Sequence, residues 1–294
     1  MQCKDKQTDK MAVQEVIKFT KMHGLGNDYI YINCLEGAPR DPAALAIEMS
    51  DRHKGVGADG IILIMDSNVA DFKMRMFNAD GSEGKMCGNA SRCIGKYVYE
   101  HGLTDKQIIK LETMSGIKIL SLDVKGGKVE AVTVDMGEPV IDSHLVPVVS
   151  DKPSVINATV STTAGDVRIN AVSMGNPHGV VFVDDLDRVD VHALGRELEM
   201  HPMWPDRANI EFAQVMSSGR IRMRVWERGS GETLACGTGA CATAVAAAIN
   251  GLTDREVAVD LLGGTLEIDW GDDGHVYMKG GATTVYSGCY PRTT

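Results

Sequence analysis

Aromatic side chains and positive charge are both scarce in this sequence. Only 5% of its 294 residues are Phe, Tyr or Trp, and 40 acidic residues outnumber 30 Lys and Arg, which gives a formal net charge of -10. A protein that binds nucleic acid or an anionic membrane needs a positive face, which this balance does not favour. We therefore expect no nucleic-acid partner and no membrane partner, and instead a small-molecule one.

Long hydrophobic runs are also absent. The longest uncharged segment, 233–253, is rich in Ala and is interrupted by Gly237, Gly239 and Gly251, so it predicts a buried helix and not a membrane span. The first ten residues carry charged Lys and Asp side chains where a secretion signal has an apolar core. On these grounds we expect a cytoplasmic chain.

Cysteine pairs with the spacing of zinc sites are missing. The chain has seven cysteines, an odd number, and no C-x-x-C pair, which argues against a disulfide scaffold, a zinc site and a thioredoxin-type motif. His23, His53 and His178 do not have the spacing of metal ligands on a helix. We expect free thiols and no metal site.

What the sequence does contain is a hidden duplication. Its 44% hydrophobic and 24% charged residues fit a globular protein long enough for two domains. At one offset of 149 residues, segment 73–77 (KMRMF) matches segment 222–226 (RMRVW). The same offset matches Gly26-Asn27 with Gly175-Asn176, Glu83 with Glu232, Cys87 with Cys236, and Gly88 with Gly237. One shared offset indicates two domains of the same architecture, whose equivalent cysteines face each other.

Each half is predicted to consist of strands followed by one helix. Residues 61–65 and 72–77 have strand patterns, and a helix is expected to start after Cys87 and to stop at Gly102. In the second half a helix opens at 237–239 and ends near 250–251, and strands are expected at 257–262, 265–270 and 275–279. The predicted fold class is α+β (mixed α/β), with two pseudo-symmetric domains, each a curled mixed β-sheet around a central helix, and the active site in the cleft between them.

The expected domain boundaries follow from this plan. Residues 1–16 are expected to be a disordered N-terminal extension. The first domain comprises 17–136 together with a C-terminal strand at 283–294, and the second domain comprises 137–282. An exposed strand in the second half could support a homodimer.

The strongest chemical signal is a thiol at the start of a helix, which occurs twice. Cys87 and Cys236 are each followed by Gly and a small polar residue, so the first backbone N–H groups of both helices are unpaired. Such groups bind anions and stabilise a thiolate, which is expected to lower a cysteine pKa. We therefore expect one bound carboxylate to lie on the backbone N–H groups of Gly88, Asn89, Gly237 and Thr238.

Two matched thiols on opposite sides of one cleft suit racemisation. Inverting a Cα centre requires a base on one face and an acid on the other, and converging helix N-termini stabilise the carboxylate as it gains enolate character. The plainer alternative is that both cysteines fill small buried spaces, as free cysteines often do. The repeated Gly-rich flank favours the catalytic interpretation.

The chain resembles the diaminopimelate epimerases from Phe19 onward. The resemblance rests on segments 23–28 (HGLGND), 77–83 (FNADGSE), 87–89 (CGN), 175–178 (GNPH), 227–229 (ERG) and 235–239 (ACGTG). It implies two similar domains that close over the substrate. It also implies a cofactor-independent isomerase that interconverts LL-2,6-diaminopimelate and meso-diaminopimelate, a step in making lysine and a peptidoglycan precursor.

The resemblance also implies residue roles. Cys236 would be the base for the LL substrate and Cys87 the acid, with roles exchanged in reverse, while His178 and Glu227 would tune the two thiols. At the distal end Arg228 would bind the second carboxylate and Glu227 the second ammonium group, which fits the chemistry of a guanidinium fork beside a carboxylate. The remaining substrate contacts would come from Asn27, Asn78, Asn176 and Asn209.

Two positions depart from the family pattern, and two alternative functions remain. Gly60 stands where family members often have glutamine, so one substrate contact is expected to be missing or supplied by water. Ala90 replaces a usual glycine, a mild change if the position is already helical. A proline or hydroxyproline racemase would also use two thiols. Its substrate has only one amino-acid end, so it needs no residues to bind a second carboxylate and ammonium group. A thiol redox sensor would instead link Cys87 and Cys236 in a reversible disulfide.

Overall fold

The computed structural model describes residues 14–293. Its helices are α1 (Pro42–Ser50), α2 (Gly88–Glu100), α3 (Val191–Glu199), α4 (Gly237–Ile249) and the short 3-10 helix η1 (Leu186–Arg188). The strands of the first half are β1 (Gln14–Gly24), β2 (Asn27–Asn33), β3 (Gly60–Met65), β4 (Phe72–Asn78), β5 (Glu83–Gly84), β6 (Ile108–Thr113), β7 (Gly116–Lys125) and β8 (Lys128–Asp135). The later strands are β9 (Ala158–Thr162), β10 (Gly165–Ser173), β11 (Pro177–Phe182), β12 (Asn209–Ser217), β13 (Arg220–Glu227), β14 (Gly231–Thr233), β15 (Glu256–Leu261), β16 (Gly264–Trp270), β17 (Val276–Gly280) and β18 (Thr283–Thr293).

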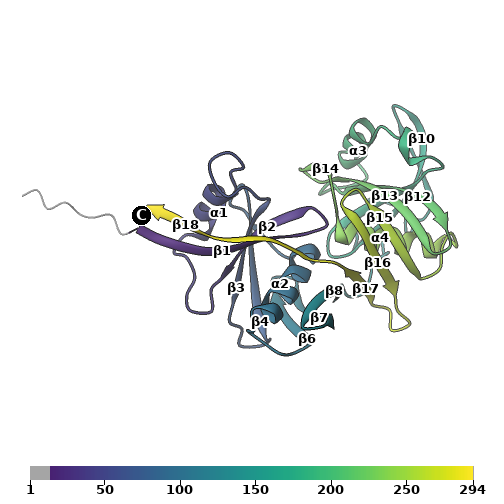
Figure 1. Cartoon of the computed structure of the whole chain (residues 1–294). Coiled ribbons are helices and arrows are strands. Elements are labelled where there is room, and N and C mark those ends of the chain that lie inside the picture. The colour runs from purple at the N-terminus through teal and green to yellow at the C-terminus, as the bar shows by residue number, and fades with distance from the viewer. Residues whose placement is uncertain (1–13, 294) are drawn as a thin grey trace, which may run out of the picture.

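The strand pairing confirms the internal duplication. In the first lobe β2 runs parallel to β3, β3 antiparallel to β4, and β4 antiparallel to β5; in the second lobe β11, β12, β13 and β14 repeat these pairings in the same order. Ile61 pairs with Phe77, and 149 residues later Ile210 pairs with Trp226. Figure 1 shows the two lobes that result. The molecule is therefore an α+β protein with two pseudo-symmetric domains, as predicted.

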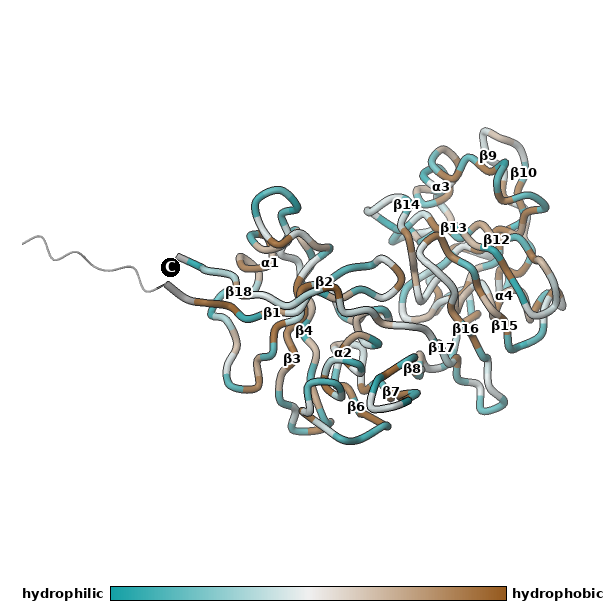
Figure 2. The backbone as a smooth tube through the Cα atoms, viewed as in Figure 1, coloured by the Kyte–Doolittle hydropathy of each residue, from teal (hydrophilic) through white to brown (hydrophobic). Residues whose placement is uncertain are grey.

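A central helix lies inside each sheet. In α2 every residue from Gly88 to Val98 is buried except Lys96. In α4 the Ala-rich sequence is buried on almost every side, because Ala residues allow strands to approach the helix closely from several directions. The tube in Figure 2 shows hydrophobic segments within the lobes and hydrophilic segments in many outer loops. Both helices begin directly after the cysteines and end two residues before Gly102 and Gly251.

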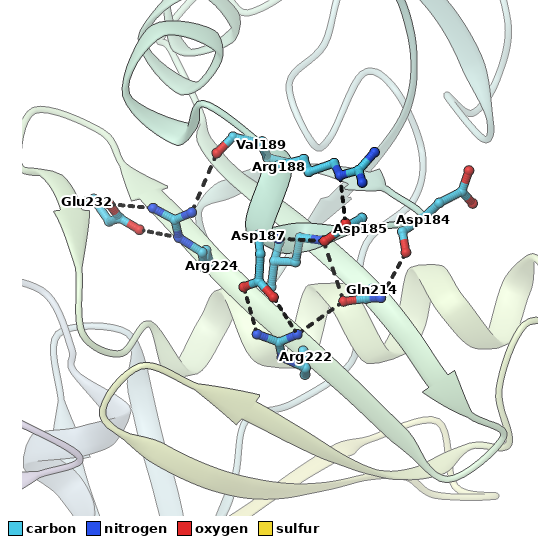
Figure 3. Close-up of polar contacts among 10 residues, drawn as sticks. Asp184, Asp185, Asp187, Arg188, Val189, Gln214, Arg222, Arg224 and Glu232 are labelled. Atoms are coloured by element: carbon cyan, nitrogen blue, oxygen red, sulfur yellow. Dashed lines mark hydrogen bonds and ion pairs between the residues drawn. The ribbon is translucent and has the colours of Figure 1, made fainter.

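The duplication extends to side-chain contacts that hold two hairpins. In the first lobe the guanidinium of Arg75 binds Glu83 through two hydrogen bonds of 2.7 and 3.0 Å across β4 and β5. At the equivalent place Arg224 binds Glu232 through bonds of 2.7 and 3.1 Å across β13 and β14 (Figure 3). Bidentate pairs fix orientation as well as distance. The turn at the tip of each hairpin is thereby held at the edge of the space between the lobes.

The two lobes are joined by strands that cross between them. Strand β17 pairs with β16 of the second lobe and with β8 of the first, and β18 then returns along β1. Figure 1 shows β18 running back over the first lobe. These pairings support the division that we propose, with 17–136 and 283–294 in the first domain and 137–282 in the second.

The N-terminal boundary needs adjustment at its described end. Residues 1–13 of the expected extension lie outside the described residues. Gln14 is already part of β1 and pairs with Thr293, so we place the start of the first domain no later than Gln14. Among the helices of residues 14–293, none is both long and apolar enough to cross a membrane.

Candidate active site

A cleft of about 1760 Å³ lies between the two lobes. Both candidate thiols line it, together with side chains from the two hairpin turns. The predicted site residues that line it are Asn27, Asn78, Cys87, Gly88, Asn89, Asn176, Glu227, Arg228, Cys236, Gly237 and Thr238. Two predicted residues, His178 and Asn209, are buried and lie behind these lining residues. The tertiary structure thus brings most of the sequence-predicted site to one place.

The starts of α2 and α4 meet at one methionine. A Cβ atom on Gly88 would lie 2.6 Å from Cε of Met278, and one on Gly237 would lie 2.8 Å from its Sδ. The same atom on Gly237 would lie 3.7 Å from Oδ1 of Asn89. Glycine at both positions is therefore required for this close approach. It leaves two sets of unpaired backbone N–H groups directed toward one region, where an anion binds favourably.

Cys87 caps the helix that it precedes. Its Sγ accepts a hydrogen bond from the backbone N–H of Ala90 at 3.5 Å, and its thiol lies 3.4 Å from Oδ1 of Asn27. The side chain of Asn89 spans the lobes, because its Nδ2 donates to Oδ1 of Asn27 and to the backbone carbonyl of Ala235, both at 3.3 Å. The two thiol-bearing segments are therefore held in a fixed relation in the structure.

Asn27 is itself anchored by charged residues that the sequence did not single out. Its Nδ2 donates to Asp59 Oδ2 at 2.8 Å, and Asp59 in turn binds Arg52 at 2.9 Å. Arg52 also binds Asp28 at 2.7 Å. Because Asp59 takes the amide N–H, the carbonyl oxygen of Asn27 is directed to Cys87 and Asn89. Asp59 follows the glycine-rich loop before β3, a position with no local signal for this role.

Cys236 lies in a more negative environment than Cys87. It is 6% exposed, its Sγ is 3.5 Å from the hydroxyl of Thr238, and the Nδ2 of Asn209 approaches it at 4.0 Å. The hydroxyl of Thr233 donates a hydrogen bond to the carboxyl group of Glu227. Of the two residues expected to tune the thiols, Glu227 acts on Cys236 through its charge, which raises the pKa of that thiol.

The expected lowering of the cysteine pKa values is wrong for both thiols. Burial raises the pKa of Cys87, although the N–H groups of Ala90 and Asn89 oppose this shift. Burial also raises the pKa of Cys236 well above its ordinary value, and the carboxylates of Glu227 and Glu211 raise it further. The helix N-termini act in the expected direction. However, the free-energy cost of removing each thiolate from water exceeds the stabilisation that the N–H groups provide.

His178 lies one layer behind the thiols. Its ring is fully buried, with Nδ1 2.7 Å from Oε1 of Glu211 and Nε2 3.2 Å from Oδ1 of Asn176. Glu211 was not predicted as a site residue, yet it is fully buried, and its Oε2 has no hydrogen-bond partner among the described residues. A charged residue within the otherwise apolar segment 210–213 was the available signal. Burial raises the pKa of Glu227, and the hydrogen bond from Thr233 opposes that rise.

The distal end of the cleft contains the predicted arginine. Arg228 is exposed, and its Nη1 donates to the backbone carbonyl of Asp206 at 2.8 Å. Its backbone N–H donates to Oδ1 of Asn209 at 2.8 Å, so Asn209 positions the turn that carries Arg228. A second hollow of about 510 Å³ is lined by Arg228 and residues 205–207. The guanidinium thus stands at the mouth of the site with donors available to a carboxylate.

The structure explains both departures from the family pattern. A Cβ at Gly60 would lie 2.1 Å from the carbonyl oxygen of Phe77 and 2.9 Å from the Tyr29 ring, so this backbone has no room for a side chain there. At the 149-residue offset the equivalent of Gly60 is Asn209, so the second lobe carries an amide where the first has none. Ala90 lies within helix α2, so the condition under which we expect its replacement of glycine to be mild is met.

Within residues 14–293, no group of three or more His, Cys, Asp or Glu side chains is arranged to hold a metal ion. The polar groups that line the cleft are thiols, amides, hydroxyls, carboxyl groups, guanidinium and ammonium groups, and the N–H groups of the two helix starts. This donor set is suited to binding an organic zwitterion and to moving protons. The fold and the paired helix-start thiols define an isomerase of the racemase and epimerase class.

The chain belongs to the diaminopimelate epimerase family, whose model matches residues 19–141 and 170–285. The chain is 52% identical over 273 residues to the diaminopimelate epimerase of Acetivibrio thermocellus, covering 92% of this chain and 98% of that relative. It is 54% identical over 273 residues to the diaminopimelate epimerase of Phocaeicola vulgatus, covering 92% of this chain and 97% of that one.

Solved structures with the same fold are much more distant in sequence. A phenazine biosynthesis protein from Bacillus anthracis gives a TM-score of 0.67 at 18% identity, covering 95% of this chain and 100% of that chain. A hydroxyproline epimerase from Agrobacterium vitis gives a TM-score of 0.66 at 16% identity, covering 94% and 91%. These similarities establish the two-domain fold alone.

Replacing Glu227 with Gln is expected to speed alkylation of Cys236. The carboxylate raises the pKa of Cys236, so its removal lowers that pKa and increases the thiolate fraction above the pKa of Glu227. Alkylation by iodoacetamide between pH 8 and 9, followed by peptide mass mapping, should show a rate increase of about threefold or more at Cys236. Glu83→Gln, which neutralises a carboxylate in the other lobe, is the control. An unchanged or slower rate at Cys236 would contradict the assigned electrostatic effect.

Proposed function

We propose that the chain is a cofactor-independent, two-cysteine epimerase that interconverts LL-2,6-diaminopimelate and meso-diaminopimelate, a step in the synthesis of lysine and of a peptidoglycan precursor. The observation that carries the proposal is the pair of thiols at two converging helix starts, in a chain of the diaminopimelate epimerase family. A cofactor is not needed for the chemistry, since proton transfer at Cα requires only a base, an acid and stabilisation of the carbanion.

The two thiols divide the proton transfers between them. For the LL substrate the thiolate of Cys236 removes the Cα proton while the thiol of Cys87 delivers its own proton to the opposite face. The thiolate is then on Cys87, and the reverse reaction exchanges the roles. The α-carboxylate lies on the N–H groups of Gly88, Asn89, Gly237 and Thr238, where the helix N-termini stabilise the enolate character of the transition state.

The distal end of the substrate selects diaminopimelate. Arg228 binds the second carboxylate through two parallel N–H bonds, and Glu227 binds the second ammonium group. Asn78, Asn176 and Asn209 support this end, and Asn27 lies near the reacting centre because its carbonyl oxygen faces Cys87. Glu227 lies beside Cys236, so it links the distal clamp with the reacting thiol.

The two alternatives receive less support. A proline or hydroxyproline racemase would leave Arg228 without a partner on the substrate, and the similarity to the hydroxyproline epimerase is limited to the fold. A redox sensor needs one acidic thiol and a resolving thiol, whereas here burial raises the pKa of both. Family membership favours the diaminopimelate epimerase reading over both.

Each of Cys87→Ser and Cys236→Ser is expected to reduce epimerisation by at least about 100-fold, because serine is a far weaker acid than cysteine. The measurement is deuterium incorporation at Cα in deuterated water, with diaminopimelate compared with lysine, glutamate and proline. In the wild type, early deuterium should appear in the product epimer and not in recovered substrate, since the acid thiol carries a solvent proton.

Cys289→Ser is the control, since this exposed thiol lies on β18 and away from the cleft. Full activity in either cleft variant would refute the two-thiol mechanism. Exchange of proline at a rate equal to that of diaminopimelate would favour the racemase alternative instead.

Arg228→Lys is expected to lower kcat/KM for diaminopimelate by roughly 100-fold or more. Lysine keeps the positive charge but cannot reproduce two parallel N–H bonds to the second carboxylate, so the substrate loses its orientation at this end. Alkylation of both cleft thiols by iodoacetamide should continue near the wild-type rate. Arg207→Lys is the matched control, because Arg207 lies at the same mouth but pairs with Glu199. Unchanged kinetics in Arg228→Lys would refute the assignment of Arg228 to the second carboxylate.

We also propose that the protein is a cytoplasmic homodimer. A two-thiol mechanism needs both cysteines reduced, which the cytoplasm ensures. Strand β18 is 11 residues long and pairs on one side with β1, and its Val285 and Tyr286 are 52% and 44% exposed. An edge strand with exposed apolar side chains can pair with its own copy about a two-fold axis.

Val285→Glu is therefore expected to convert the dimer into a monomer, because two like charges would face each other across the axis. Sedimentation equilibrium at several protein concentrations is the measurement, and Val69→Glu, on an exposed loop of the first lobe, is the control. A wild-type chain that sediments as a monomer at all concentrations would refute the dimer.

A further inference from the structure

Arg92 is a buried cation that the proposed reaction does not yet use. It lies on α2, five residues after Cys87, and its side chain is fully buried. No Asp or Glu of the described residues forms an ion pair with it. Burial lowers the pKa of its guanidinium, but arginine starts from so high a value that the group stays charged at neutral pH. A buried charge without a counter-ion is costly, so its presence calls for a negative charge that arrives later.

Among the described residues, the polar contacts of Arg92 are with neutral groups. Its Nη2 donates to Oδ1 of Asn89 at 2.8 Å, its Nε donates to the carbonyl of Gly281 at 3.3 Å, and its Nη1 lies 3.6 Å from Sδ of Met278. Gly281 lies between β17 and β18, where the chain passes between the lobes (Figure 1). Arg92 therefore orients the amide of Asn89 from a place just behind the meeting point of the two helix starts.

Two glycines, Gly24 and Gly280, leave room for the guanidinium of Arg92. A Cβ on Gly24 would lie 3.0 Å from Nη2 of Arg92, and one on Gly280 would lie 3.3 Å from its Nε. Two strands from opposite ends of the sequence thus approach the guanidinium without side chains of their own. The backbone is shaped to accept a large cation at this point.

The equivalent position in the other lobe carries no charge. At the 149-residue offset Arg92 corresponds to Cys241, which is neutral and fully buried on α4. The opposite asymmetry holds for acids, because Glu227 corresponds to Asn78 and Glu211 corresponds to Ile62. The pseudo-symmetric site therefore has a cation behind Cys87 and two carboxyl groups near Cys236.

The other groups that face the two thiols do not cancel this difference. Cys87 is faced by the phenol of Tyr29, by Asn27 with Asp59 behind it, and by the more distant Glu227. Near Arg92 lie Tyr31 and Cys93, which are neutral in their ordinary states. Cys236 is faced by Glu227 and Glu211, with His178 bound to Glu211 on the far side.

We propose that Arg92 is a positioning residue that makes Cys87 the more acidic of the two thiols in the substrate-free enzyme, through its buried charge and its hold on Asn89. This inference rests on the proposed function, in which one thiol must be charged and the other protonated. As the pH rises, Cys87 loses its proton to solvent before Cys236 does. The substrate-free molecules that carry one thiolate then carry it on Cys87, the form that accepts a Cα proton there.

The test follows the ionisation of each thiol separately. Wild-type protein and variants are treated with iodoacetamide from pH 6 to pH 11 without substrate, and the alkylation rates of Cys87 and Cys236 are obtained by peptide mass mapping. Arg92→Gln keeps an N–H donor for Asn89 without the charge, Arg92→Met fills the slot with an uncharged chain, and Arg92→Lys keeps the charge. Circular dichroism checks that each variant is folded.

In the wild type the midpoint for Cys87 is expected about one pH unit or more below that for Cys236. The two neutral variants should raise the Cys87 midpoint by about one unit and move the Cys236 midpoint less, while Arg92→Lys should stay near wild type. The proposal is overturned if Cys236 ionises first in the wild type, or if a folded neutral variant leaves the Cys87 midpoint unchanged. If both neutral variants fail to fold, the order in which Cys87 and Cys236 ionise in the wild type decides whether the proposal stands. Because no diaminopimelate is used, failure of the proposed function would appear only in the exchange experiment.

Discussion

The whole site depends on the close approach of two helix starts, which two glycines permit. Gly88 and Gly237 lie against the same side chain, Met278, and a Cβ on either would come within 3 Å of it. Each helix is fixed by its own sheet. Contact between the two helix starts therefore fixes the position of one lobe relative to the other. Because unpaired N–H groups lie at both starts, one region between the lobes has a positive potential from two directions. In the function that we propose, the α-carboxylate of the substrate binds at that convergence.

Pseudo-symmetry supplies the framework, and departures from it supply the chemistry. The strand register and the Arg–Glu clamps repeat at 149 residues, so the backbone of the two half-sites is alike. The side chains that face the thiols differ: Tyr29 stands opposite His178 in the alignment, and Gly60 opposite Asn209. An acid and a base must differ in protonation at any moment, and an unequal charge distribution is one physical means of achieving this.

Burial of the thiols has two opposing consequences. It raises the pKa of both, which reduces the fraction that is deprotonated in the free enzyme. It also removes water from the reacting centre, so that the N–H groups and charges around it act with less screening. The same desolvation that makes the thiolates costly therefore makes each surrounding dipole more effective when the substrate carboxylate is present.

The sequence by itself determined the features that depend on neighbouring residues. The helix starts at Gly88 and Gly237, the buried Ala-rich helix, the paired cysteines and the repeat follow from local patterns, and the motifs were sufficient to indicate the family. The family resemblance also named the residues of the cleft, although the placement of His178 behind Glu211 was not foreseen.

Only the tertiary structure decided the properties that depend on packing between distant segments. The direction of the thiol pKa shifts was mispredicted because desolvation is set by strands far away in the sequence, whereas helix capping is local. The lack of room at Gly60 arises from the carbonyl of Phe77, a ladder partner on the next strand. Arg92 has an ordinary position on an amphipathic helix, and its lack of an acidic partner within residues 14–293 emerges only when the segments around Gly24 and Gly280 close over it.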